Sequence, residues 1–417
     1  MSKQKSILEI ICSGRMLVAL LMGFACGLPL LLTISVLQAW MKEEGVDLTV
    51  IGIMSLVGIP YTLKFLWAPF LDRFTLPFLG RRRGWLLTAQ TALMLSIVWM
   101  GFTNPVNNLW ALGFTAFLVT FFSASQDIVV DAYRREDLSD DELGFGSSLY
   151  VNGYRIGMLL ASGGGLIMAD HMPFSMVYLI MAACLLPGVL TTFFAPEPVI
   201  PFEPPKTMKD AVTEPLLEYF SRQGALWILA FILLYKIGDS MASAMTMPFY
   251  LEIGFSKTEI GTVVKLFGFW ATIAGSLIGG IFMIRLGINR SLWIFGFLQA
   301  LSTAGFAVLA QIGHSIVALS YVIAFENLSA GMGTTAYAAF MAAITNKKFT
   351  ATQYALLTSL MGIPRVIASA PTGFFAKNLG WEGFFIACTL IAIPGMLLLL
   401  KFAPWNPKET EKSEITL

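Results

Sequence analysis

The sequence is poor in charge, cysteine and histidine. Only 13% of its 417 residues are charged, against roughly 25% in soluble domains. The four cysteines lie far apart, which argues against a disulfide framework or a metal site, and the two histidines, His171 and His314, fall in predicted turns. No glycine-rich phosphate loop carrying Lys and Ser or Thr is present. We therefore expect neither an enzyme nor a nucleic-acid-binding protein, with no cofactor and no bound metal.

What the chain has instead is long apolar runs. It is 56% hydrophobic with a mean hydropathy of +0.73. Because a bilayer core about 30 Å thick needs about 20 apolar residues in a helix, each long run bounded by charge predicts a span. We predict an all-α membrane protein of twelve transmembrane helices, at residues 16–40, 50–70, 85–103, 109–132, 146–168, 175–195, 226–250, 259–284, 291–311, 316–344, 352–374 and 383–403.

Lys and Arg are distributed unevenly over the predicted loops. With the N-terminus inside, nearly all of those outside the spans fall on the cytoplasmic side, and the exceptions are Lys42, Lys257 and Lys377. Both termini are therefore predicted to be cytoplasmic. The first run has no small-residue cleavage site, so we expect a retained helix and a multi-pass membrane protein.

A proline-rich polar stretch divides the chain after six predicted spans. We expect an N-terminal half at 1–196, a cytoplasmic linker at 197–224, a C-terminal half at 225–404 and a cytoplasmic tail at 405–417. A shift of about 210 residues superposes the halves in parallel, which is the arrangement of major facilitator transporters. In that fold the substrate binds between the halves, near the midplane.

The loop after the second predicted span is similar to the superfamily's Asp-Arg…Gly-Arg-Arg signature. Asp72 and Arg73 stand at the helix end, and Arg81 and Arg82 follow in a tight basic turn. Such charges can pair with neighbouring helices in one conformation and release them in another, so we expect these four residues to act in gating. The alternative is that the arginines only set membrane topology.

Charged residues within predicted spans usually face a cavity and mark a pathway. In the fourth span, Asp127 and Asp131 are spaced i,i+4 and share a face with Gln126 beside them and Arg134 one turn below. Asp131 and Arg134 are assigned to gating, and Asp127 to gating or proton coupling. A plain ion pair at the helix end is the alternative.

Three further charged residues lie near mid-membrane in the second half. Lys236 and Asp239 are spaced i,i+3 in the seventh span, where mutual neutralisation is the alternative to a functional role. Glu326, in the tenth span, is the first choice for a protonatable coupling group, and Asp239 is the other candidate in this half. The alternative for Glu326 is a structural carboxylate paired across the cavity with Lys236, Lys265 or Arg365.

The charged residues within the spans have an excess of cations. We therefore predict a cavity that favours an anionic substrate and is lined by Lys64, Arg155, Lys236, Lys265, Arg365 and Gln126. Trp40, Tyr61 and Tyr235 can present flat faces to sugar rings, although anchoring at the interface explains many membrane aromatics.

Several segments resemble the AmpG muropeptide permeases, over essentially all twelve predicted spans. They are Gly23–Pro29, Leu37–Trp40, Phe65–Pro69, Gly80–Trp85, Ser125–Asp131, Tyr235–Asp239, Phe325–Asn327, Gly331–Gly333 and Ala351–Ala355. The Gln-Asp…Asp motif of Ser125–Asp131 is shared with related acetyl-CoA transporters. The resemblance implies a protein of the bacterial inner membrane. It also implies proton-driven import of N-acetylglucosaminyl-1,6-anhydro-N-acetylmuramyl peptides for peptidoglycan recycling, with a link to beta-lactamase induction.

The predicted partners are thus the anhydromuropeptide substrate, protons and membrane lipid, with no nucleic acid and no obligate protein partner. One alternative is a transporter of another anionic solute, such as a CoA ester or a siderophore. From a different class, a membrane-embedded transferase or a receptor would need a catalytic constellation or a signalling domain, and the sequence shows neither.

Overall fold

The structure is a computed structural model that describes residues 7–199, 205–222, 224–256, 259–368 and 371–405. In this described part the regular elements are helical. The chain forms two compact units, one of Met1–Leu216 with Thr345–Ser359, and the other of Leu217–Ile344 with Leu360–Leu417. The first unit thus takes in a short segment from late in the sequence, which becomes important at the site.

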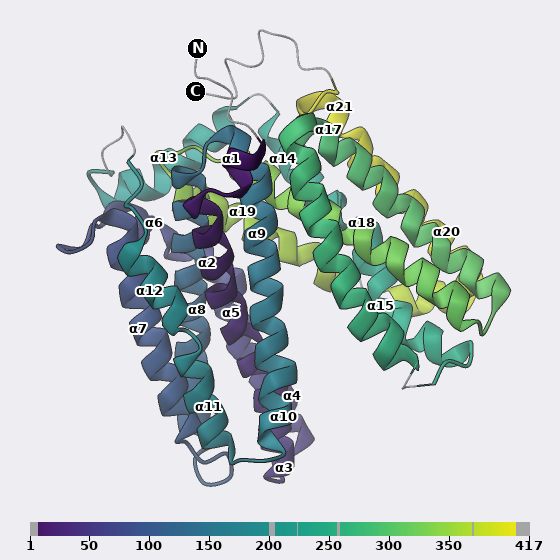
Figure 1. Cartoon of the computed structure of the whole chain (residues 1–417), viewed down its shortest axis with the longest axis horizontal. Coiled ribbons are helices and arrows are strands. Elements are labelled where there is room, and N and C mark those ends of the chain that lie inside the picture. The colour runs from purple at the N-terminus through teal and green to yellow at the C-terminus, as the bar shows by residue number, and fades with distance from the viewer. Residues whose placement is uncertain (1–6, 200–204, 223, 257–258, 369–370, 406–417) are drawn as a thin grey trace. The chain divides into compact units, whose positions relative to one another are not determined.

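The first unit holds the helices of the N-terminal part of the chain (Figure 1). Their bounds are α1 Ile7–Ile11, α2 Gly14–Leu31, η1 Leu32–Val36, α3 Leu37–Glu43, α4 Leu48–Met54, η2 Ser55–Gly58, α5 Ile59–Leu63, η3 Lys64–Leu66, α6 Ala68–Arg73, α7 Arg81–Gly101, α8 Leu109–Asp137, α9 Asp140–Leu159, η4 Leu160–Gly164, α10 Gly165–Ala169, α11 Phe174–Ala183 and α12 Leu186–Phe194.

Glycine allows two helices of the first unit, α2 and α9, to pack closely along their length. A Cβ built on Gly153 would overlap the carbonyl of Leu20, and one built on Gly27 would overlap the carbonyl of Tyr154. Small residues of this kind let helix backbones approach closely in membranes. Helix α7 packs against α8 and α11, and a core of buried apolar side chains fills the space between the helices.

The second unit holds the remaining long helices, and two of these contain a break. The bounds are α14 Ala225–Leu234, α15 Ile237–Glu252, η5 Ile260–Phe267, α17 Gly268–Ile312, α18 Ile316–Ala343, α20 Thr372–Leu397 and α21 Leu399–Phe402. Helix α17 is broken at Gly287, where φ is 75°, and helix α20 is broken at Gly380, where φ is 68°. Glycine adopts this left-handed region without a Cβ penalty.

Two further helices cross from one unit's residues to the other's. Helix α19 runs from Thr350 to Ile367, and its residues up to Ser359 belong to the first unit. The boundary between the units also falls within α13, Met208–Ser221, after Leu216. In the second unit, α17 packs along α18 and α20, and close approaches at Gly275 and Gly331 bring the backbones of α17 and α18 together.

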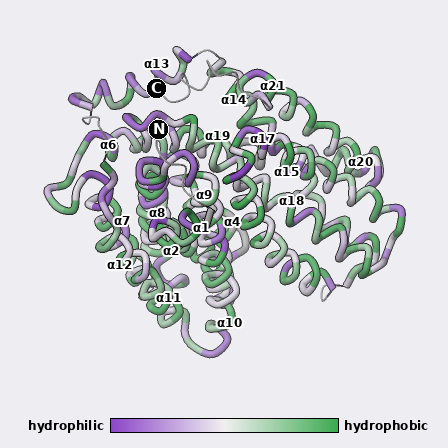
Figure 2. The backbone as a smooth tube through the Cα atoms, turned by 45° about the horizontal axis from the view of Figure 1, so that its top comes forward, coloured by the Kyte–Doolittle hydropathy of each residue, from purple (hydrophilic) through white to green (hydrophobic). Residues whose placement is uncertain are grey.

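Eight helical stretches among the described residues are long and apolar enough to cross a membrane. In Figure 2, α18 and α20 are hydrophobic over most of their length. Compared with the twelve predicted spans, the eighth and ninth are joined in one stretch, Ile260–Ile312, while the second, fifth and eleventh are not among the eight. The count of twelve therefore remains a prediction.

The predicted second span, residues 50–70, is not one continuous helix. It is divided into α4, η2, α5, η3 and α6, with Pro60 and Pro69 each at the start of a short helix. Proline lacks an N–H and is tolerated in the first turn of a helix, where that donor has no partner. These breaks place Lys64 in a tight 3-10 turn, facing inward, with only 7% of its surface exposed.

Candidate functional site

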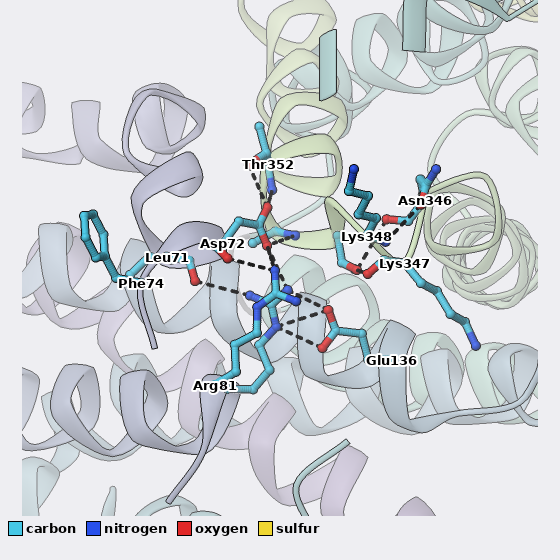
Figure 3. Close-up of polar contacts among 12 residues, drawn as sticks. Leu71, Asp72, Phe74, Arg81, Glu136, Asn346, Lys347, Lys348 and Thr352 are labelled. Atoms are coloured by element: carbon cyan, nitrogen blue, oxygen red, sulfur yellow. Dashed lines mark hydrogen bonds and ion pairs between the residues drawn. The ribbon is translucent and has the colours of Figure 1, made fainter. Parts of the chain in front are cut away.

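The end of α6 carries a carboxylate that is completely buried and fully engaged. Asp72 is 0% exposed. Its Oδ1 accepts hydrogen bonds from Arg82 Nη2 at 2.8 Å and Arg81 Nη2 at 3.3 Å. On the other side it meets the start of α19, as Figure 3 shows. We call Asp72, Arg81, Arg82, Glu136, Ala351 and Thr352 the Asp72 network.

Asp72 caps the first turn of α19, although it lies far from that helix in the sequence. The backbone N–H of Thr352 donates to Oδ2 at 2.8 Å, the Thr352 hydroxyl donates to the same oxygen at 2.7 Å, and the N–H of Ala351 donates to Oδ1 at 3.3 Å. The first N–H groups of a helix have no partner within the helix, and its N-terminus carries partial positive charge. A carboxylate is therefore a favourable cap.

Arg82 connects this cap to α8. Its guanidinium donates to Glu136 from Nη2 at 2.6 Å and from Nε at 2.9 Å, in addition to Asp72. The side chains of Arg82 and Glu136 are each 1% exposed, so both charges are desolvated and compensated. Buried ion pairs of this kind are stable only while every partner is present. The network is thus sensitive to the loss of any one member.

A second polar group is built around two charged residues of α8. We call it the Arg134 cluster, and its members are Lys64, Asp131, Arg134, Ser147 and Tyr354. Arg134 donates to the Ser147 hydroxyl at 2.6 Å, to the Tyr354 hydroxyl at 2.7 Å and to Asp131 Oδ1 at 3.2 Å. Lys64 Nζ lies 3.9 Å from Asp131 Oδ2. Asp131 is therefore shared between two cations.

Near this cluster, Asp127 and Gln126 are buried with unused hydrogen-bonding capacity. Among the described residues, Asp127 Oδ1 and Gln126 Oε1 have no hydrogen-bond partner, whereas Gln126 Nε2 donates to Cys26 Sγ at 3.4 Å. The Tyr61 hydroxyl donates to Ser123 at 2.9 Å. A buried polar atom without a partner is costly, so it marks a place where a ligand, a water or a proton can bind.

The second unit has its own charged group, the Lys236 cluster: Lys236, Asp239, Gln299, Ser302, Glu326 and Thr334. Lys236 Nζ lies 3.4 Å from Asp239 Oδ2 and donates to Gln299 Oε1 at 3.1 Å and Thr334 Oγ1 at 3.3 Å. Ser302 donates to Glu326 Oε2 at 2.5 Å, and Glu326 lies within electrostatic reach of Asp239 and Lys236. Two neighbouring carboxylates repel each other when both are charged.

The remaining residues predicted for the site lie outside these groups. Lys265 is exposed on η5, and Arg155 is half-buried on α9. The guanidinium of Arg73 lies 4.9 Å from the centre of the Phe74 ring. Arg365 is on α19, and its side chain lies outside the part of the chain that the structure describes.

Two of the aromatic residues expected to face sugar rings are covered by the protein. Trp40 is 5% exposed and stacks on Phe174 at 5.5 Å. Tyr235 stacks on Tyr337 at 5.5 Å, and its hydroxyl donates to the carbonyl of Leu292. Both rings therefore act as packing residues in this conformation, because their faces are in contact with other side chains.

Several members of the networks were missed by sequence reasoning. Glu136, Thr352 and Tyr354 meet their partners only through the fold, and so do Gln299 and Ser302. For Glu136 a signal existed, because it follows two arginines at the end of a long apolar helix. For Thr352, the sequence around Asp72 gave no indication of which helix it would meet, and for Tyr354 the sequence around Arg134 gave none either.

Outside the spans, one lysine near the Asp72 network has a perturbed pKa. The pKa of Lys347 is lowered, first by partial burial and then by the positive charge of Arg135. Lys347 and its neighbour Lys348 precede α19 and are drawn beside the network in Figure 3. Lys348 Nζ instead pairs with Glu214 Oε2 of α13 at 3.0 Å.

Comparisons with known proteins place the chain in a family. The sequence profile described as Major Facilitator Superfamily matches residues 16–369 and 237–416. The anhydromuropeptide permease of Escherichia coli (strain K12) is 44% identical over 395 residues, which cover 94% of this chain and 80% of that protein. The chain belongs to the AmpG family of the Major Facilitator Superfamily.

Solved structures agree with the fold. A human organic anion transporter, MFSD10, matches with a TM-score of 0.68 at 15% identity, covering 95% of this chain and 100% of that one. The proton:xylose symporter XylE matches with a TM-score of 0.69 at 12% identity, covering 95% and 96%. This AmpG-family chain is therefore a multi-pass transporter of the bacterial inner membrane, and not an enzyme.

Proposed function

We propose that the chain imports N-acetylglucosaminyl-1,6-anhydro-N-acetylmuramyl peptides from periplasm to cytoplasm, for peptidoglycan recycling, by proton-driven alternating access. The observation that carries the substrate class is the 44% identity to an anhydromuropeptide permease over 94% of this chain. Since 94% of the chain is aligned, the similarity takes in most of both predicted halves. A link to beta-lactamase induction would follow where the cell contains a system that senses the imported peptide.

The topology that we propose has twelve spans with both termini cytoplasmic. The halves are residues 1–196 and 225–404, joined by the linker at 197–224 and followed by the tail at 405–417. The breaks in α17 at Gly287 and in α20 at Gly380 support this count, because each divides one long helix into two segments. The uneven distribution of Lys and Arg supports the orientation.

Positive charge within the spans supports an anionic substrate. The lactyl and peptide carboxylates of an anhydromuropeptide need cations, and its sugars need hydrogen bonds. We assign Lys64, Arg155, Lys236, Lys265 and Arg365 to substrate carboxylates, with Gln126 and Tyr61 as hydrogen-bonding residues. The unused oxygen of Gln126 supports its inclusion. Trp40 and Tyr235 have no role in this proposal, because their ring faces are covered.

Charge balance in the Lys236 cluster offers a route to proton coupling. With one proton bound, Asp239 and Glu326 together carry one negative charge, which Lys236, paired with Asp239 at 3.4 Å, neutralises. A second proton makes the cluster positive, and Lys236 is then free to bind a substrate carboxylate. Because unbalanced charge is costly inside a membrane, proton and anionic substrate should bind together. Glu326 is the primary proton carrier, Asp239 shares it, and Asp127 is a further candidate.

The networks of the first unit are assigned to gating. Asp72 with Arg81 and Arg82 holds the start of α19 in this conformation. Asp131 and Arg134 hold the same helix through Tyr354, two residues further along. Breaking both sets of contacts would free α19 to move, as alternating access requires. Arg73 stands beside the network and is expected to join it in another conformation.

The test is uptake of radiolabelled disaccharide anhydromuropeptide by cells that lack their own permease and express this chain. We expect uptake that a protonophore abolishes, and that unlabelled anhydromuropeptide competes but a CoA ester or a siderophore does not. Glu326→Gln should abolish accumulation. Glu382→Gln is the matched control, because Glu382 is exposed and bonds only to Gln311 among the described residues. The proposal would be contradicted if correctly inserted protein gave no uptake, or if Glu326→Gln accumulated the substrate at the wild-type level.

A further inference from the structure

Helix α13 carries an apolar face that none of the described residues covers. Val212, Leu216 and Phe220 are spaced four residues apart, so they form one stripe along the helix, and Leu217 lies at its edge. Their exposed fractions are 40%, 36%, 50% and 69%. Large contiguous apolar patches are rare on soluble surfaces, so four such side chains along one helix point to a surface that they contact.

The face of α13 next to the stripe is attached to the protein. Ala211 and Tyr219 are buried, with 0% and 1% of their surface exposed. Within the first unit, Gln353 Nε2 of α19 donates to the Pro215 carbonyl at 3.1 Å, and Lys348 pairs with Glu214 at 3.0 Å. The orientation of the helix is thus fixed, and the apolar stripe is held facing outward.

The apolar stripe does not come from a membrane span. Helix α13 has 14 residues, which gives a length of about 21 Å, short of a bilayer core of about 30 Å. It also carries Asp210, Glu214 and Glu218 on one side. Three residues, 222–224, separate it from α14, where a candidate span begins at Ala225, and three residues reach about 10 Å. The end of α13 is therefore tethered at the membrane surface.

At α13 and the residues just before it, the acidic side chains have partners among the described residues, whereas two lysines form no ion pair with them. Glu214 pairs with Lys348, and Glu218 pairs with Arg222 at 2.6 Å. The Asp210 carboxylate accepts the backbone N–H of Thr207 at 3.1 Å, in a capping arrangement at the N-terminus of the helix. Lys206 and Lys209 are exposed and enter no ion pair with the described residues. The local acids are occupied, whereas these lysines are available.

From these observations we infer that α13 docks onto the anionic lipid surface of the membrane, with its apolar stripe inserted among the headgroups. Lys206 and Lys209 then contact lipid phosphates. An amphipathic helix with an apolar face and nearby lysines is bound at such an interface by buried apolar area and by attraction to anionic lipid. Because α13 also contacts Gln353 and Lys348, docking holds the segment that leads into the Asp72 network.

The experiment uses the full chain in vesicles, with an environment-sensitive bimane label at a single cysteine. The background carries Cys12→Ser and Cys184→Ala, because Cys26 and Cys388 are buried. Leu216→Cys places the label on the stripe. Ser221→Cys is the matched control, since Ser221 is exposed on the same helix away from the stripe. Val212→Cys is the second stripe position, should labelling at 216 disturb folding.

The label at 216 should be quenched by lipids brominated near the headgroup and protected from aqueous iodide, with the reverse at 221. In vesicles containing phosphatidylglycerol, Lys206→Gln and Lys209→Gln should each lower the ratio of docked to undocked helix about fivefold. Iodide quenching at 216 equal to that at 221 would overturn the inference. Protection from both quenchers would also overturn it, because protein would then cover the stripe. Equal lipid quenching in phosphatidylcholine alone would refute the role of the lysines.

Discussion

Replacing Asp72 with asparagine should release the start of α19. The substitution keeps the size of the side chain but removes its charge and one of the acceptor oxygens that bind Arg82 and the first N–H groups of the helix. Breaking a buried ion pair by removing one partner costs about 3–5 kcal/mol. Arg82 keeps Glu136 as a partner, so we expect about 3 kcal/mol, which is about a hundredfold in the local opening equilibrium.

Hydrogen–deuterium exchange of the purified chain measures that opening directly. The peptide that contains Ala351 and Thr352 should exchange about a hundredfold faster in Asp72→Asn than in the wild type. Asp140→Asn is the control, because Asp140 also pairs with an arginine but its side chain is 60% exposed. A surface pair contributes at most about 1 kcal/mol, so this variant should change exchange about fivefold or less. Equal exchange in both variants would refute the assignment of Asp72 as the cap of α19.

Two further variants test helix packing and the carboxylate that accepts hydrogen bonds from Ser256. Gly153→Ala should lower the free energy of unfolding by about 1–3 kcal/mol, because the Cβ of the new alanine overlaps the Leu20 carbonyl. Gly14→Ala is the control, because the space around Gly14 is open, and it should leave thermal unfolding unchanged. The Ser256 backbone N–H and then its hydroxyl, with His314, lower the pKa of Glu259. The pKa of Glu259 is lower in the folded than in the unfolded protein, so this stabilisation is present at neutral pH and is lost as the pH falls through the folded value. The wild type should therefore melt at a higher temperature than Glu259→Gln at neutral pH but not in acid. A difference in melting temperature that does not depend on pH would contradict this.

Local spacing allowed the ion pairs within single helices to be predicted. Asp131 and Arg134 are three residues apart on α8, and the structure places their charges 3.2 Å apart. Lys236 and Asp239 have the same spacing and lie 3.4 Å apart. In an α-helix, residues at i and i+3 face the same side whatever the rest of the fold does. The functional roles given to these residues remain predictions.

Contacts between distant segments could not be predicted in this way. Asp72 and Thr352 lie 280 residues apart, and nothing in the basic turn after α6 specifies α19 as its partner. Glu326 likewise has no cation near it in the sequence, but the fold brings it to Asp239 and within the electrostatic reach of Lys236. Such pairings depend on how whole helices pack, which one sequence does not encode locally.

The aromatic residues illustrate a different limit. Trp40 and Tyr235 have the flat faces that sugar recognition needs, but a buried packing residue has the same composition. The structure covers both rings with other aromatic side chains. Likewise, the apolar run at 50–70 predicted one span, while Pro60 and Pro69 divide it into short helices.

In the proposed mechanism, proton and anhydromuropeptide movement are coupled through Glu326. The most direct measurement is accumulation of labelled disaccharide anhydromuropeptide by the purified chain in proteoliposomes, with an acidic exterior and a pH-sensitive dye inside. We predict accumulation together with internal acidification in the wild type, and substrate exchange without accumulation or acidification in Glu326→Gln. Accumulation without proton entry, or accumulation by Glu326→Gln at the wild-type level, would contradict the account.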